Sequence, residues 1–127
     1  MKRSFVSSIM MLVCLTLLLV PHVKAQGSGV GLSIRVSPTT TAPGTTVGVI
    51  GYVTNMTTKK MRATVTFTSL SPCGIETQIG YNRVALNPGQ TMMITATYPI
   101  AADACRGPYT ISINANGATT SATLLVQ

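Results

Sequence analysis

Two cysteines, two carboxylates and an arginine are the residues of this chain whose chemistry could combine at one site. The stretch "DACRGPYTISI" places Asp103 and Arg106 on either side of Cys105, and Cys73 stands three residues before Glu76. A cysteine in such surroundings could be a nucleophilic thiolate, a metal ligand or one half of a disulfide. The compartment in which the chain folds decides among these three chemistries.

The first 25 residues have the layout of a secretory signal peptide. Two basic residues precede an uncharged, mostly apolar run over residues 5–20, and Val23 and Ala25 occupy the −3 and −1 positions of a cleavage site. An uncleaved membrane anchor is a weaker alternative, because a span needs roughly 20 apolar residues. Lipoprotein processing at Cys14 is weaker still, because apolar residues follow it. We therefore predict cleavage after Ala25 and export to the periplasm or the extracellular space, with no integral membrane segment left.

Cleavage after Ala25 changes which chemistry remains. It would remove the only histidine, His22, together with Cys14, and would leave Cys73 and Cys105 as the two cysteines of the mature chain. An even pair in an oxidising compartment predicts a disulfide between Cys73 and Cys105. A thiolate nucleophile would lack a histidine base, and a zinc site would lack its usual histidine ligands.

The carboxylates offer a further catalytic alternative. A Cys73–Cys105 disulfide would bring Glu76 and Asp103 near each other, as a paired-carboxylate mechanism requires. Solvated loop charges, with Arg83 or Arg106 as a partner, are the plainer interpretation of the same two residues. We therefore predict a protein that is not an enzyme, with no catalytic residues, no metal site and no cofactor.

The mature chain is weakly basic. Its six basic and two acidic residues leave +4, against +7 for the whole sequence, which is too little for a nucleic-acid surface. Lys59, Lys60 and Arg62 form the one basic cluster, at a predicted hairpin tip. The cluster could weakly attract anionic lipid, polysaccharide or nucleic acid, or simply keep the turn solvated. Tyr52 and Tyr81 are the rings most suited to an exposed ligand contact.

Asn55-Met56-Thr57 has the pattern of an N-glycosylation sequon. Its use depends on the host, and a threonine-rich chain also produces such triplets by chance. Glycosylation of Asn55 therefore stays open at the level of sequence.

Period-two alternation of apolar and polar residues runs through the mature chain and predicts short strands. Turn residues such as "PG" at residues 43–44, "NPG" at 87–89 and "NG" at 116–117 separate them. Glycines inside the strand "TVGVIGYVTN" indicate a bulge or a close backbone approach. Adjacent Met92 and Met93 must face opposite sides of a strand, so that one of them could be an exposed contact. The predicted strands are "GLSIRVSP", "TVGVIGYVTN", "MRATVTFTSL", "IETQIGY", "RVAL", "QTMMITATYP", "YTISINA" and "ATTSATLLV".

Seven or eight strands at this spacing predict an all-β fold, an immunoglobulin-like antiparallel β-sandwich with one disulfide. The segments "RVSPTTTAPGTTVGVIGYVTN", "VALNPGQTMMITATYP" and "GPYTISINANG" resemble bacterial immunoglobulin-like modules of the CARDB type, which are exported adhesion or spacer domains. The resemblance implies the sandwich, a non-catalytic role and a tyrosine-corner-like packing role for Tyr109. It supplies no ligand, because a fold does not fix a function.

These observations give one domain organisation and two functional hypotheses. Residues 1–25 are the predicted signal peptide, residues 26–31 a glycine-rich flexible lead and residues 32–127 the sandwich domain. The leading hypothesis is an exported, non-catalytic binding or structural module that presents a sandwich surface to a protein partner at the cell envelope or outside the cell. The alternative is a small carbohydrate- or envelope-binding protein that uses the basic tip and the exposed tyrosines, with polysaccharide as its candidate ligand.

Overall fold

The computed structural model describes residues 24–25 and 29–127 of the chain, so residues 1–23 of the predicted signal peptide and residues 26–28 of the predicted lead lie outside the described residues. Seven long strands and two strands of two residues make up this part of the protein. The strands are β1 (Lys24–Ala25), β2 (Val30–Ser37), β3 (Thr40–Thr41), β4 (Thr46–Asn55), β5 (Met61–Leu70), β6 (Glu76–Leu86), β7 (Thr91–Pro99), β8 (Gly107–Ala115) and β9 (Ala118–Val126).

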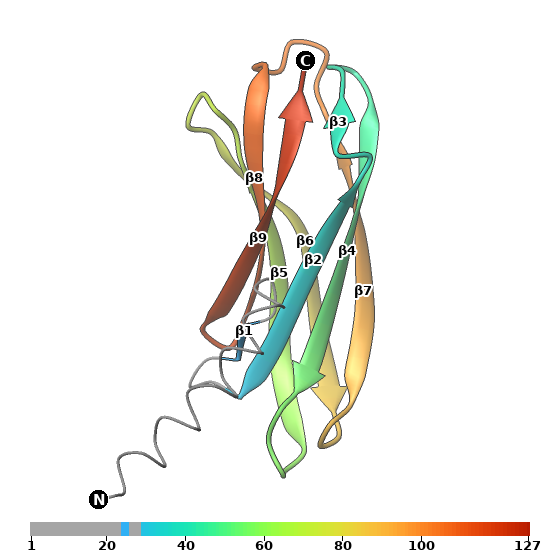
Figure 1. Ribbon diagram of the computed structural model, residues 1–127, viewed down its shortest axis with the longest axis vertical. Helices are drawn as coiled ribbons and strands as arrows, with labels where there is room; N and C mark the ends of the chain where they lie inside the picture. The colour runs from blue at the N-terminus through green and yellow to red at the C-terminus, as the bar shows by residue number, and fades with distance from the viewer. Residues whose placement is uncertain (1–23, 26–28) are drawn as a thin grey trace, which may run out of the picture.

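The strands form two sheets that pack face to face as an elongated sandwich (Figure 1). The first sheet has the order β1-β2-β4-β7, and the second has the order β3-β9-β8-β5-β6. Every pairing is antiparallel except the short contact of β3 with β9, which is parallel. The predicted all-β sandwich is therefore confirmed.

The connection between β4 and β5 differs from the prediction. These strands belong to different sheets, so residues 56–60 cross from one sheet to the other and are not the tip of a hairpin. Alternation along each strand indicated which side chains face inward, but it carries no information about which neighbouring strand shares a sheet.

The core lies between the two inner faces, where the predicted alternation places the apolar side chains. Phe67 on β5 is fully buried at its centre. A Cβ atom added to Gly51 on β4 would lie 2.8 Å from Cζ of Phe67 and 2.6 Å from Cδ1 of Ile113. One added to Gly80 on β6 would lie 2.9 Å from Cδ2 of Phe67. The expected close approach within β4 is thus confirmed at Gly51, because two glycines make room for one phenylalanine ring.

The segments "IETQIGY" and "RVAL", which were expected as two strands, form the single strand β6. Its register with β5 shifts between Phe67, which pairs with Gly80, and Thr68, which pairs with Gln78. Ile79 therefore has no partner on β5 and forms a β-bulge. The alternation of inward and outward side chains along β6 shifts by one residue at this bulge. From Tyr81 onward, alternate residues of β6 lie on the outer face of the second sheet.

Candidate functional site

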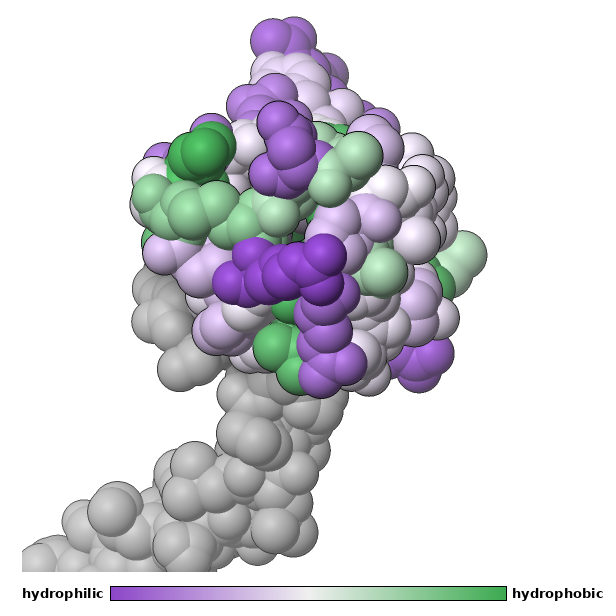
Figure 2. All heavy atoms as spheres, turned by 90° about the horizontal axis from the view of Figure 1, so that it is seen from above, coloured by the Kyte–Doolittle hydropathy of each residue, from purple (hydrophilic) through white to green (hydrophobic). Residues whose placement is uncertain are grey.

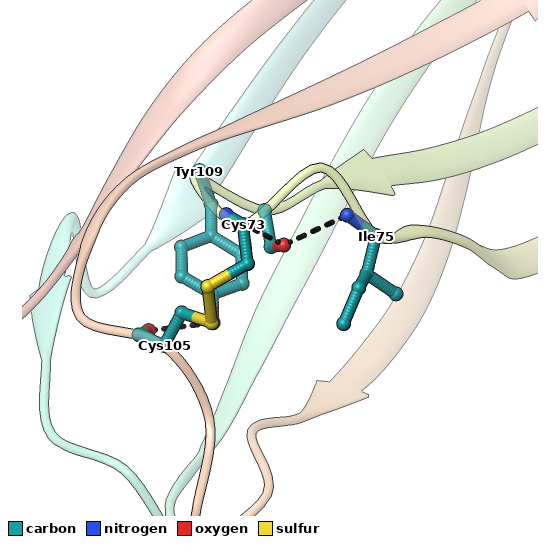
Figure 3. The surroundings of a disulfide bond; sticks show 5 residues. Cys73, Ile75, Cys105 and Tyr109 are labelled. Atoms are coloured by element: carbon teal, nitrogen blue, oxygen red, sulfur yellow. Dashed lines mark hydrogen bonds between the residues drawn. A yellow bond between two sulfur atoms is a disulfide. The ribbon is translucent and has the colours of Figure 1, made fainter.

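Cys73 and Cys105 form the predicted disulfide, with their Cα atoms 6.3 Å apart (Figure 3). The bond joins the β5–β6 turn to the loop between β7 and β8, closing a separation of 32 residues. A loop of this length corresponds to about 3.5–4 kcal/mol in the chain-entropy model. A disulfide also favours an oxidising compartment, in agreement with the predicted export.

Two further interactions hold the same loops. The hydroxyl of Tyr109 donates a 2.7 Å hydrogen bond to the carbonyl oxygen of Cys105 (Figure 3). Oγ of Ser71 accepts from the backbone N–H groups of Cys73 and Ile75 at 3.2 and 3.1 Å. The bond of Tyr109 has the form of a tyrosine corner, as the resemblance implied. The loop around Cys105 therefore has a structural role, because it connects the start of β8 to the β5–β6 turn.

The two carboxylates do not combine into a site. Asp103 lines a depression of about 330 Å³ beside the disulfide, together with Ile75, Thr77 and Tyr98. Glu76 is outside this lining, and because its neighbour Thr77 faces the depression, Glu76 faces the other side of β6. Seen end-on, this end of the sandwich carries apolar side chains in separate spots among polar ones (Figure 2). The arrangement lacks the convergence that a carboxylate pair needs.

The structure separates the other candidate residues into three places. Lys59 and Lys60 lie in the crossover between the sheets and are exposed. Arg62 on β5 and Tyr81 on β6 share the outer face of the second sheet, where Arg62 pairs with Ala85 and Tyr81 pairs with Thr66. Tyr52 lies on β4 in the first sheet, opposite Met93 on β7. The predicted basic and aromatic set therefore does not form one surface.

Arg83 joins Arg62 and Tyr81, although the sequence suggested it only as a partner for a carboxylate. Arg62 and Arg83 line a depression of about 460 Å³ on the outer face of β5 and β6, with Thr64 and Asn116. Nε of Arg83 donates a 3.2 Å hydrogen bond to the hydroxyl of Tyr81, and this bond raises the pKa of the guanidinium above its ordinary value. In the sequence, only the alternation within "RVAL" could have indicated that Arg83 faces away from the core.

Asn55 is fully buried, with 0% of its surface exposed. Its Nδ2 donates to the carbonyl oxygens of Lys59 and Leu86 at 2.8 and 3.0 Å. Its Oδ1 accepts from the N–H and the hydroxyl of Thr57 at 2.9 and 2.6 Å. Both hydrogens of the amide are therefore used within the fold. The folded domain offers no free amide for a glycan, and Asn55 instead fixes the crossover between the two sheets.

The four edges of the sheets differ in how far they are protected. The predicted cleavage after Ala25 removes β1, so one edge of the first sheet in the exported chain is β2, which carries the charged Arg35. In the second sheet, β3 covers the free side of β9 only at Leu125 and Val126, and the other edge, β6, has a bulge at Ile79 and the charged Arg83. The fourth edge, β7, is nine residues long, pairs without a register shift to β4 and carries no charged side chain. It forms one rim of the sandwich (Figure 1). Bulges, charges and short length normally protect edges from pairing, and β7 has none of these features.

The hydrogen bonds at the two ends of β7 identify which of its backbone groups point away from β4. N–H of Ile100 donates to the carbonyl of Thr45 at 2.7 Å, and N–H of Asn55 donates to the carbonyl of Gln90 at 2.9 Å. Antiparallel pairs alternate between bonded and non-bonded positions. The N–H and C=O groups of Met93, Thr95 and Thr97 therefore point away from β4, toward the open edge.

Solved structures of similar fold include parts of much larger proteins. The chain matches alkylpurine DNA glycosylase from Pseudomonas fluorescens with 14% identity and a TM-score of 0.70, over 80% of this chain and 31% of that one. It matches a β-glucosidase from Erythrobacter marinus with 11% identity and a TM-score of 0.67, over 77% of this chain and 15% of that one. The chain thus spans less than a third of either enzyme.

A CARDB domain from Pyrococcus furiosus, solved in complex with di-metal ions, is matched over most of its own length. The identity is 14% and the TM-score is 0.61, over 76% of this chain and 87% of that domain. The predicted CARDB-type resemblance is confirmed as a likeness of fold. No protein-family model matches the chain. No curated protein matches it either.

The described residues hold few groups suited to a metal. Over residues 24–25 and 29–127 there is no group of three or more histidine, cysteine, aspartate or glutamate side chains that could hold an ion. Within the same part of the chain, no helix has the length and apolar character needed to cross a membrane. This part of the protein offers a β-sandwich with an uncovered, uncharged edge at β7 and a basic depression on β5 and β6.

Proposed function

We propose that this protein is an exported, non-catalytic binding module that docks an extended segment of a protein partner onto the open edge of β7. The partner segment adds as a further strand to the first sheet, in the mode called β-augmentation. Backbone groups of Met93, Thr95 and Thr97 supply the hydrogen bonds. The observation that carries the proposal is the state of this edge, which runs for nine residues without a charge, a bulge or a covering strand, whereas β2 and β6 carry arginines and β9 is partly covered by β3.

The side chains next to the edge suit a protein segment. Met93 is 58% exposed and lies opposite Tyr52 on the outer face of the first sheet. Ile50 on β4 is partly exposed on the same outer face and pairs with Thr95 on β7. A partner strand added beside β7 would place alternate side chains next to Met93, and burial of its thioether stem would add to the backbone bonds. Pro99, which has no N–H to donate, limits the docked stretch to the residues before it.

Export rests on two features that agree with each other. The amino-terminal residues have the layout of a signal peptide, and the Cys73–Cys105 disulfide requires an oxidising compartment to persist. The proposed partner is therefore a protein of the periplasm, the cell surface or the surrounding medium.

A pair of variants at Thr95 tests the docking. Thr95→Pro removes one outward N–H, and an edge strand tolerates this change because the bond to β4 does not use that group. Thr95→Ala removes the same side chain and keeps the N–H. Both variants and the unchanged domain are crosslinked in envelope and medium fractions, and the captured proteins are quantified by mass spectrometry.

The proposal expects a protein that is captured by the unchanged domain and by Thr95→Ala and is lost with Thr95→Pro. Thermal unfolding of each variant verifies that the domain remains folded. Capture that is equal for Thr95→Pro and Thr95→Ala would rule out docking at this edge.

A further inference from the structure

A second surface lies on the other sheet, away from β7. The outer face of β5 and β6 holds Arg62 and Arg83 around a depression of about 460 Å³. From the register, Tyr81, Arg83 and Ala85 follow one another along β6, and Arg62 lies opposite Ala85. Each step of two residues covers about 7 Å along a strand, so Tyr81 and Arg62 are separated by ~14 Å along the strands, with Arg83 between them.

The charge of this face is not neutralised by the protein. The sequence has two acidic residues, and both Glu76 and Asp103 lie at the disulfide end. Among the described residues, neither Arg62 nor Arg83 forms an ion pair, and the bond of Arg83 to Tyr81 leaves its other guanidinium donors free. Two arginines with free donors in one depression constitute a local excess of positive charge.

The wall of the depression is fixed by hydrogen bonding. Asn116, at the β8–β9 turn, has a φ of 48°, and its Nδ2 donates a 3.1 Å bond to the carbonyl of Arg62. Asparagine and the following Gly117 tolerate this left-handed backbone, which explains the tight "NG" turn predicted from the sequence. The turn is thereby held against the end of β5, and it closes one side of the depression.

We propose that Arg62 and Arg83 bind the carboxylates of a linear acidic polysaccharide, with the ring of Tyr81 against a sugar face. A guanidinium presents two parallel N–H donors to a planar carboxylate, and a lysine ammonium cannot do so. Tyr81 is 50% exposed and next to Arg83, where a flat sugar ring can cover it. Two cations around a depression, with one ring beside them along the strand, can contact successive sugars of a linear chain.

Two other polyanions fit this face less well. A membrane surface would be expected to meet large apolar side chains beside the charges. Apart from Tyr81, the residues around the two arginines are small or polar, or half-buried as Val84 is. A single-stranded nucleic acid would stack its bases on several aromatic rings, and this face offers one. The proposal is independent of the docking at β7, since it uses the other sheet and other residues.

The probe for the test is polygalacturonate oligosaccharide at low ionic strength, followed by NMR titration of the domain. We expect the amide signals of Arg62, Arg83 and Tyr81 to shift. The double variant Arg62→Gln/Arg83→Gln should bind about tenfold more weakly, because it loses two charge-assisted contacts. Arg35→Gln, which removes an exposed arginine from the first sheet, should lose less than about twofold in affinity.

A charge-conserving variant separates a shaped site from diffuse attraction. Arg62→Lys/Arg83→Lys keeps both charges and should still bind several-fold more weakly than the unchanged domain. The proposal would be overturned if Arg35→Gln lost as much affinity as Arg62→Gln/Arg83→Gln. It would also be overturned if the lysine variant bound as tightly as the unchanged domain. Equal binding of the neutral oligosaccharide maltohexaose would overturn it as well. Tighter binding to phosphatidylserine vesicles or to single-stranded DNA than to polygalacturonate would assign the face to those ligands instead.

Discussion

The hydroxyl of Tyr109 donates its hydrogen bond to the backbone carbonyl of Cys105, the residue that forms the disulfide with Cys73. The loop before β8 is therefore held twice, once by a covalent bond to the β5–β6 turn and once by the first inward side chain of β8. The rings of Tyr109 and Tyr98 also lie 6.4 Å apart between the sheets. The loop that carries Asp103 and Arg106 is thus part of the rigid scaffold.

Replacing Tyr109 by phenylalanine should lower the free energy of unfolding by about 1 kcal/mol, because one intramolecular hydrogen bond is lost while the ring remains buried. Urea unfolding followed by circular dichroism measures the change. Tyr81→Phe, at an exposed position, is the matched control and should change stability by less than about 0.5 kcal/mol. Equal values for the two variants would show that the bond to Cys105 contributes nothing.

Alkaline conditions should also act through Tyr109. Burial raises the pKa of its phenol above the ordinary value of 10.0, and the neighbouring Tyr98 adds to the rise. Above pH 10 the unfolded chain releases this proton more readily than the folded one does, so stability is present below that pH and is lost as the pH rises through the folded pKa. Urea unfolding between about pH 8 and pH 11 should show a steeper loss for the unchanged domain than for Tyr109→Phe. Parallel curves would contradict this assignment.

Gly51 should tolerate no side chain. Gly51→Ala places a methyl group against Phe67 and Ile113, and this overpacking should cost about 1–3 kcal/mol. Gly48 lies on the same strand, where an added Cβ would meet only the carbonyl oxygen of Ser37, at 3.6 Å. Gly48→Ala should therefore be neutral or slightly stabilising. Thermal unfolding compares the two, and equal melting temperatures would refute the proposed close packing.

Asn55 should be a structural residue. Asn55→Ala leaves the buried carbonyl of Leu86 without its side-chain donor and should lower stability by about 2–3 kcal/mol. Asn82→Ala, at an exposed position on β6, should change stability little. In a host that glycosylates sequons, mass spectrometry of the folded, secreted domain should find Asn55 unmodified. A folded domain with a glycan at this position would disprove its burial.

Strand positions and inward faces could be predicted from the sequence because alternation reports burial one strand at a time. The same alternation could not show that β4 and β5 belong to different sheets, and Lys59 and Lys60 were consequently placed on a hairpin. The bulge at Ile79 could not be predicted, because the amino-acid composition of a strand does not reveal a single inserted residue. Arg83 became a candidate only when the register placed it beside Arg62 and Tyr81. Asn55 illustrates the reverse case, since its sequon pattern indicates a surface residue while its four side-chain bonds bury it.

The open edge of β7 is tested most directly by residue-resolved amide hydrogen exchange. In the free domain, the amides of Ile94 and Ala96 should exchange slowly, and those of Met93, Thr95 and Thr97 should exchange fast, because only the first set bonds to β4. In the complex with the partner captured by the unchanged domain, Met93, Thr95 and Thr97 should become at least about tenfold slower. If these three amides keep their fast exchange in the complex while protection arises elsewhere, the partner does not dock at β7.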